Sequence, residues 1–156
     1  MSHLDSVDSP DAAACITGTS RYPVYYEDTD FSGYVYHANY LKFFERARED
    51  LIGLDYLHEL YEQGRHYVVS RVELAFIKPG RHGDLIEVRT RMEITTGPAC
   101  IVEQEAVRLA KEPNEPATTL VKAKIKLVAV NNQGAPTRMP AEVLEHLRQR
   151  VGSPSP

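Results

Sequence analysis

Two aspartates and a histidine lie close together in the sequence, just ahead of a segment with helical periodicity. Asp28 and Asp30 flank Thr29, and His37 lies seven positions after Asp30. A carboxylate can act as a general base or as a nucleophile, and a helix N-terminus stabilises negative charge that develops beside it. The same residue types also serve in turns and caps, and a single histidine near a helix start is commonly structural. The residues alone leave both interpretations open.

The segment that follows predicts an apolar helix over residues 39–52. Its large side chains recur at three- and four-residue steps and therefore share one face, and Gly53 provides a C-terminal stop. We expect this helix to be buried, with its N-terminus next to the acidic turn. Its apolar positions are Tyr40, Phe43, Phe44, Ala47 and Leu51, and the residues expected to form ion pairs on its wetter side are Glu45, Arg46, Arg48, Glu49 and Asp50.

Period-two alternation predicts strands over residues 66–77, 85–94, 99–109 and 118–130. Such strands have one buried and one wetter face, as antiparallel sheets do. The row formed by Lys122, Lys124 and Lys126 is expected on an exposed sheet face or as an edge guard. The apolar faces carry Val68, Val72, Leu74 and Phe76, then Ile86, Val88, Met92 and Ile94, and finally Val121, Ala123, Ile125 and Leu127.

One apolar helix followed by four long strands predicts an α+β fold, in which a long curved antiparallel sheet wraps around the helix. A preceding strand is expected over 19–27, where Pro23 indicates an edge strand or a local break. Short helices are expected over 55–63 and after Pro140.

The expected organisation is a single domain over residues 19–150. Residues 1–18 are expected to form a disordered N-terminal tail, and residues 151–156 a flexible C-terminus.

Composition excludes several classes of protein. The 156 residues carry a formal net charge of −4, which argues against nucleic-acid binding. No apolar run approaches the roughly 20 residues that span a bilayer, and no basic-then-apolar leader opens the chain. Two cysteines, Cys15 and Cys100, make no disulfide framework, so a cytoplasmic location is expected. The histidines show no metal-ligand spacing, and we expect no metal.

The stretch from Tyr25 to Arg48 resembles the hotdog-fold acyl-CoA thioesterases. The resemblance is closest to the 4-hydroxybenzoyl-CoA thioesterase family, in particular to the bacterial acyl-CoA thioesterases whose genes accompany the Tol-Pal envelope system. Weaker similarity, including Gln104 and the segment 138–140, extends it over nearly the whole domain. The segments that carry it are Tyr25-Tyr26-Glu27-Asp28-Thr29-Asp30, then Gly33, then Val35-Tyr36-His37-Ala38-Asn39-Tyr40, and then Glu45-Arg46-Ala47-Arg48.

The resemblance implies that Asp30 is the catalytic carboxylate, acting as nucleophile or general base in thioester hydrolysis. It also implies that a backbone N–H near His37 holds the thioester oxygen, and one such donor is typically worth about 3–4 kcal/mol in the transition state. His37 itself is expected to orient Asp30 or the attacking water. Phe31-Ser32 and Tyr34 replace smaller residues that are commoner in the family. Their bulk is expected to reshape the pocket mouth and to affect acyl specificity.

The candidate substrate-binding residues are Gly33, Tyr36, Lys78 and Arg81. Gly33 is expected to act through its backbone conformation. Tyr36 and Tyr40 are expected to pack or to line the acyl pocket. The basic loop that contains Lys78 and Arg81 is a candidate for the phosphates of coenzyme A, with Arg138 behind it, although a solvated loop also carries such charges.

The resemblance also implies assembly. Two subunits are expected to join their sheets edge to edge in a C2 homodimer at least, with a homotetramer expected, so that each site uses both subunits. Coenzyme A is part of the substrate, so no cofactor is expected, and acyl carrier protein is a possible alternative carrier. Two other functions stay open: a hotdog-fold dehydratase or hydratase with His37 as base, and a non-catalytic acyl-binding protein.

Overall fold

The computed structural model describes residues 13–151. The tail residues 1–12 and the C-terminal residues 152–156 lie outside the described residues. The elements are β1 (Ala13–Pro23), the short 3-10 helix η1 (Tyr26–Asp28), α1 (Asn39–Ile52), α2 (Leu54–Glu62), β2 (His66–Phe76), β3 (Leu85–Thr95), β4 (Ala99–Arg108), β5 (Thr118–Val130) and α3 (Ala141–Val151).

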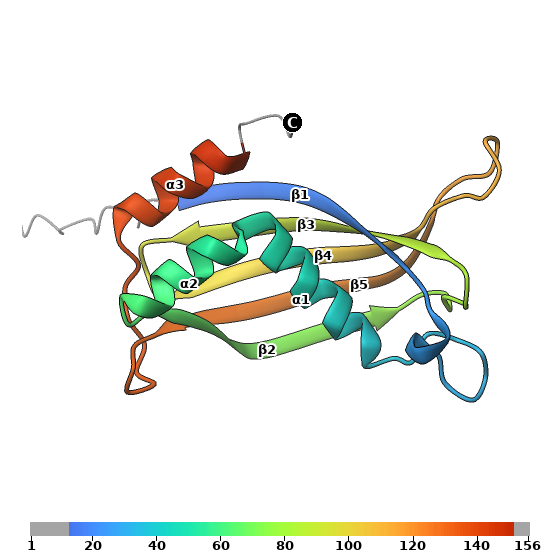
Figure 1. Ribbon diagram of the computed structural model, residues 1–156, viewed down its shortest axis with the longest axis horizontal. Helices are drawn as coiled ribbons and strands as arrows, with labels where there is room; N and C mark the ends of the chain where they lie inside the picture. The colour runs from blue at the N-terminus through green and yellow to red at the C-terminus, as the bar shows by residue number, and fades with distance from the viewer. Residues whose placement is uncertain (1–12, 152–156) are drawn as a thin grey trace, which may run out of the picture.

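The five strands form one antiparallel sheet in the order β1-β3-β4-β5-β2. The sheet is curved, and α1 lies across one of its faces (Figure 1). The predicted α+β arrangement around a central helix is therefore confirmed. The interior between helix and sheet is apolar, and its largest fully buried side chains include Phe43, Phe44, Ile16, Ile86, Met92, Ile94 and Ile125.

Helix α1 has the predicted bounds, and Gly53 ends it with φ at 97°, a conformation that other residues rarely adopt. Arg48 differs from the expectation of a solvated ion pair, because its side chain is buried. The Arg48 guanidinium donates to Oε1 of Gln104 over 2.9 Å, and burial lowers its pKa. Gln104 donates in turn to the Phe44 carbonyl over 2.9 Å and to the Thr90 hydroxyl over 3.0 Å. This polar network joins α1 to the middle of the sheet.

The first strand lies earlier in the chain than predicted. Residues 13–18, expected in the tail, belong to β1, which pairs along its length with β3. Ala14 and Ile16 point into the core. Short side chains such as Ala, Thr and Gly hid this alternation in the sequence. The edge position indicated by Pro23 is confirmed.

A bulge in β2 changes one predicted face. The register shifts between Val69 and Arg71, so Val69 pairs with Leu127, and Val72 pairs with Ile125. Opposed residues share a face, so Val69, not Val68, joins the face of Val72 and Leu74. The prediction for Val68 was wrong, because one extra residue in a strand inverts the alternation beyond it.

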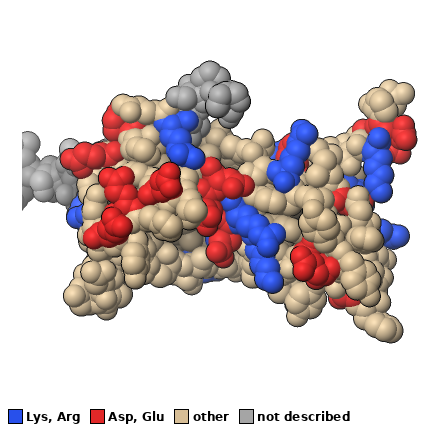
Figure 2. All heavy atoms as spheres, viewed as in Figure 1, with Lys and Arg blue, Asp and Glu red and all other residues tan. Residues whose placement is uncertain are grey.

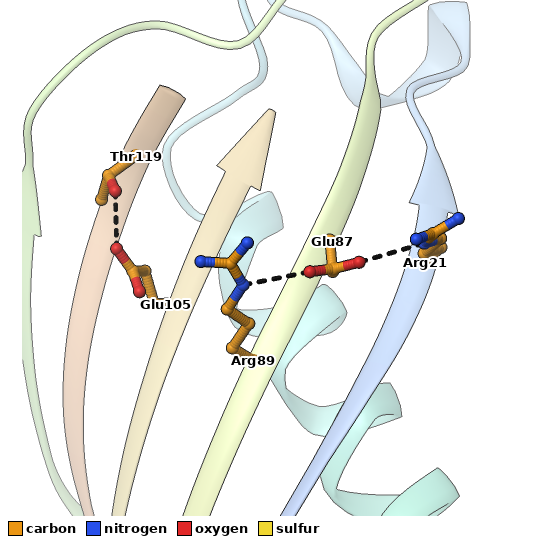
Figure 3. A network of polar contacts seen from close by, with 5 residues as sticks. All are labelled: Arg21, Glu87, Arg89, Glu105 and Thr119. Atoms are coloured by element: carbon orange, nitrogen blue, oxygen red, sulfur yellow. Dashed lines mark hydrogen bonds and ion pairs between the residues drawn. The ribbon is translucent and has the colours of Figure 1, made fainter. Parts of the chain in front are cut away.

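The sheet face opposite α1 carries both acidic and basic side chains. Glu87 lies between Arg21 and Arg89, at 3.0 Å from the Nε of each, and Glu105 accepts from the Thr119 hydroxyl (Figure 3). The contacts with the two arginines lower the pKa of Glu87, and the hydrogen bond from Arg89 is the largest cause. The row Lys122, Lys124 and Lys126 belongs to this exposed face. It is no edge guard, because β5 lies between β4 and β2.

Candidate active site

The loop between β1 and α1, residues 24–38, makes a tight turn at Asp30. The Asp30 N–H donates to the Tyr34 carbonyl over 2.8 Å, and the Gly33 N–H donates to the Asp30 carbonyl over 3.0 Å. Gly33 has φ at 82°, and a Cβ placed there would meet no neighbour within 4 Å. A left-handed backbone, not crowding, therefore requires glycine at this position. Contact between Gly33 and a substrate stays a prediction.

The Asp30 carboxylate is exposed and is held through one oxygen by Ser32. The Ser32 N–H donates to Oδ1 of Asp30 over 2.8 Å, and the Ser32 hydroxyl donates to the same oxygen over 2.5 Å. The pKa of Asp30 is lowered from its ordinary value. The largest cause is the Ser32 hydroxyl, followed by the Ser32 N–H, the backbone of Tyr34 and the charge of His37. Sequence reasoning weighed Ser32 only for its bulk. An aspartate with a serine two positions later in a turn is the signal that could have indicated this contact.

The start of α1 lies at the end of the same loop. In the described chain, the N–H groups of His37 and Ala38 have no backbone acceptor. The helix adds a partial positive charge there. The His37 ring is exposed, packs on Tyr36 at a centroid distance of 4.6 Å, and meets the edge of Phe76 at 6.4 Å. The structure thus brings a carboxylate, an imidazole and free N–H groups to one end of α1, beside the end of β2.

A buried carboxylate braces this loop. Asp28 accepts from the Tyr25 N–H over 2.8 Å and from Nδ2 of Asn39 over 2.9 Å, and its carbonyl accepts from the Tyr36 N–H over 2.8 Å. Asp28 therefore joins both ends of the loop to the first residue of α1. This is the turn and cap role that its residue type allowed, while Asn39 was missed as its partner.

The loop 78–84 packs beside the Asp30 turn. The Val35 N–H donates to the Gly80 carbonyl over 2.8 Å, and the Gly80 N–H donates to the Tyr40 hydroxyl over 3.2 Å. A Cβ at Gly80 would lie 2.9 Å from the Tyr40 hydroxyl, so only glycine permits this approach. The pairing places the Arg81 guanidinium carbon 5.2 Å from the centre of the Tyr34 ring. The structure therefore brings Arg81 next to the turn.

The remaining candidate site residues differ in how close they lie to the Asp30 turn. Tyr36 is exposed beside His37, whereas Tyr40 is buried in the core. Lys78 is exposed on the loop that carries Arg81. Arg138 does not lie behind that loop. It donates to Thr96 at the opposite end of β3, which at about 3.3 Å per residue is roughly 30 Å away.

The candidate residues lie on an open surface, not in a closed cavity. An open groove of about 830 Å³ crosses the sheet face away from α1 and contains neither Asp30 nor His37. Within residues 13–151, no cluster of three histidine, cysteine or carboxylate side chains is arranged to hold a metal ion, and no helix there is long and apolar enough to cross a membrane.

Among the described residues, the outer edge of β2 pairs with no other strand, and the site borders this edge. That edge exposes the apolar side chains Val69, Val72, Phe76 and Ile77. Exposed apolar side chains gathered along a strand edge are typical of interaction surfaces. The catalytic candidates lie beside this exposed apolar edge.

Comparisons with known proteins identify the family. Residues 24–147 match the model of the thioesterase-like superfamily. The acyl-CoA thioester hydrolase YbgC of Escherichia coli O6:H1 is 30% identical over 134 residues, which cover 83% of this chain and 96% of that protein. A probable thioesterase from Bartonella henselae, solved as a crystal structure, is 34% identical with a TM-score of 0.61 over 80% of this chain and 99% of that one.

A more distant structure supports the fold. The crystal structure of a 4-hydroxybenzoyl-CoA thioesterase variant, complexed with 4-hydroxybenzoyl-CoA, is 16% identical to this chain with a TM-score of 0.75, covering 84% of this chain and 98% of that one. At this identity the likeness concerns the fold alone. The resemblance carried by residues 25–48 is thus confirmed, and the chain belongs to the thioesterase-like superfamily, as a thioester hydrolase with the hotdog fold.

Proposed function

We propose that this protein is an acyl-CoA thioesterase in which Asp30 attacks or activates water and the start of α1 stabilises the oxyanion. One observation supports the assignment of these catalytic roles to Asp30 and to the start of α1. A carboxylate held in a fixed turn lies at the same helix end as two N–H groups without backbone acceptors. Reaction of a thioester carbonyl needs these two components, because charge moves onto its oxygen as a nucleophile adds to its carbon.

Two balanced routes use these groups. In one, an Asp30 oxygen adds to the carbonyl carbon and the C–S bond breaks, which releases coenzyme A thiolate and leaves a mixed anhydride that water then hydrolyses. In the other, Asp30 takes a proton from water while the resulting hydroxide adds to the carbonyl carbon and the same C–S bond breaks. The thiolate leaves without a strong acid and takes its proton from solvent. His37 orients Asp30 or the water. Incorporation of oxygen-18 into Asp30 in a single turnover distinguishes the first route.

The proposed active form is a homodimer joined through β2. Two features support it: the exposed apolar side chains along the unpaired edge, and the contact of Phe76 on that strand with His37. A two-fold axis at this edge would place each partner's strand beside the other subunit's Asp30 turn. A homotetramer of two such dimers is the assembly that the family resemblance implies, and sedimentation equilibrium measures it.

The proposed binding site for the phosphate-bearing part of coenzyme A is the loop surface around Arg81 and Lys78. Arg81 lies over Tyr34, close to the turn, and can meet a phosphate oxygen. Acidic side chains gather instead over α2 and the adjoining part of α1 (Figure 2). Arg81 and Lys78 therefore supply positive charge for the phosphates beside the turn. Tyr36, exposed beside His37, is the proposed acyl-side contact.

The proposed reaction takes place in the cytoplasm and requires only water and the thioester, without a cofactor. An acyl group on acyl carrier protein is the alternative substrate, since its phosphopantetheine arm presents the same thioester. Aliphatic and aromatic acyl groups are both compatible with an open site.

A panel of acyl-CoA and acyl carrier protein thioesters, followed by thiol release, tests the function. We expect release of free thiol from at least one panel member, with equal release of the carboxylic acid. Hydration of an enoyl thioester without thiol release would indicate a hydratase. Binding without turnover of any substrate would indicate an acyl-binding protein.

A further inference from the structure

We propose that Ser32 is a positioning residue for Asp30: its hydroxyl holds Oδ1 and thereby directs Oδ2 toward the thioester carbonyl or the attacking water. This inference rests on the proposed catalytic role of Asp30. It concerns a residue to which the proposed mechanism assigns no other role.

The contacts of Asp30 are one-sided. Both donors of Ser32 converge on Oδ1, and in the described chain no hydrogen bond is recorded to Oδ2. A hydroxyl has one proton to donate, so this bond commits it to Asp30. An aspartate on an exposed turn would otherwise rotate freely among its rotamers. Fixing one oxygen leaves the other oriented and available for chemistry.

The backbone makes this arrangement rigid. The Asp30 carbonyl and N–H are both engaged across the turn, with Gly33 and Tyr34 respectively. Ser32 lies between these anchors, so its backbone, with the N–H that donates to Oδ1, is held beside the carboxylate. A reacting group held within a small angular range gains rate through orientation, and a displacement of about 1 Å can cost roughly a hundredfold.

The same hydrogen bonds have an electrostatic consequence. They favour the ionised carboxylate and lower the pKa of Asp30, with the Ser32 hydroxyl the largest cause. When a partner subunit and a substrate exclude water from the turn, a bond to a charged oxygen becomes stronger. The Ser32 hydrogen bonds thus act against the rise in the pKa of Asp30 that exclusion of water would cause.

Ser32→Ala and Ser32→Thr test the role, with Asp30→Asn as the reference background. In Ser32→Ala we expect kcat to fall roughly tenfold with KM within about twofold, because orientation and not binding is lost. Ser32→Thr retains a hydroxyl and should recover most of the rate. In the Asp30→Asn background, Ser32→Ala should change the residual rate by less than about twofold, because the two residues act as one unit.

A readout independent of activity accompanies the kinetics. Carbon-13 NMR of the Asp30 carboxyl, assigned by its absence in Asp30→Asn, should show a higher pKa in Ser32→Ala than in the parent and a restored value in Ser32→Thr. Thr29→Val is the matched control, because the Thr29 hydroxyl belongs to the same loop but donates to the Tyr26 carbonyl. Its kcat and its Asp30 pKa should match those of the parent.

The possible outcomes separate the two proposals. If Ser32→Ala keeps the parent kcat and Asp30 pKa while Asp30→Asn is inactive, Ser32 has no positioning role and the function of Asp30 stands. If Ser32→Ala lowers the rate equally with and without Asp30, it acts elsewhere and the inference is wrong. If Asp30→Asn retains the parent rate, both the role of Asp30 and that of Ser32 are refuted.

Discussion

The two edges of the sheet have opposite surroundings. At the β1 edge, α3 buries Val143, Leu144 and Leu147, and α1 approaches so closely that a Cβ at Gly18 would lie 2.7 Å from Leu51. At the β2 edge, Val69 is 51% exposed and Phe76 is 53% exposed. One edge is completed by the chain itself, and the other is left open beside Asp30 and His37. We therefore expect stability to depend on the β1 edge and the proposed catalysis on the β2 edge.

Among changes that test the difference between the two edges, a charge on the open edge should produce the largest effect. Val69→Asp would place a carboxylate on the exposed edge of each subunit, and charges at an edge oppose strand pairing. We expect dissociation to monomers and a loss of kcat/KM of roughly a hundredfold or more, because each site loses its partner. Sedimentation velocity and thiol release measure both. Thr17→Asp on β1 is the matched control and should leave both unchanged; a fully active Val69→Asp monomer would refute the shared site.

A cavity beneath the covered edge should cost stability without affecting the site. Leu144 is buried between α3 and the sheet. Leu144→Ala should lower the free energy of unfolding by about 2–5 kcal/mol through lost contacts and a residual cavity. Urea denaturation measures the change. At a temperature where the variant is folded, dimerisation and kcat should match the parent, and a selective loss of dimer would contradict the division between the edges.

Disruption of the polar network between Arg48 and Gln104 should have an intermediate effect on stability. Arg48→Met removes the donor to Oε1 of Gln104 and leaves that buried oxygen without its partner. We expect a loss of about 1–3 kcal/mol in the free energy of unfolding. Thermal unfolding at pH 7 checks it. Stabilisation instead would show that desolvation of the guanidinium outweighs its hydrogen bond.

The smallest effect concerns the ion pairs of Glu87, one with Arg21 on β1 and one with Arg89 on β3 itself. The folded-state pKa of Glu87 is lowered, first by Arg89 and then by Arg21. Its stabilisation is therefore present above the ordinary glutamate pKa and disappears as pH falls through the folded-state value. Glu87→Gln should cost at most about 1 kcal/mol at pH 7, and the difference from the parent should vanish under acid conditions. Urea titrations at both pH values test the sign.

The sequence predicted those parts of the molecule in which residue type and periodicity agree. Helix α1 follows its apolar spacing and ends at Gly53, and the alternation of β3 places Ile86, Val88 and Met92 in the core. Arg48 follows Phe44 by four positions and so lies on the buried face, although its residue type indicates solvent. The bulge in β2 could not be seen because nothing in local alternation marks an extra residue.

The candidate site was only partly accessible to such reasoning. The positions of Asp30 and His37 before α1 follow from sequence order. The approach of Arg81 depends on backbone pairing between residues 34–35 and the loop 78–84, which no local pattern reveals. Arg138 was misplaced for the same reason, since the topology carries it to the other end of β3.

In the proposed mechanism, the Asp30 carboxylate performs the chemistry at the start of α1. Asp30→Asn keeps the size of the side chain and an acceptor for Ser32, and it removes the charge. In the assembled protein, with assembly verified by sedimentation and fold by circular dichroism, we expect kcat for thiol release to fall by roughly a thousandfold or more with KM nearly unchanged. Retention of the parent kcat in that variant would show that the Asp30 carboxylate does not perform the chemistry.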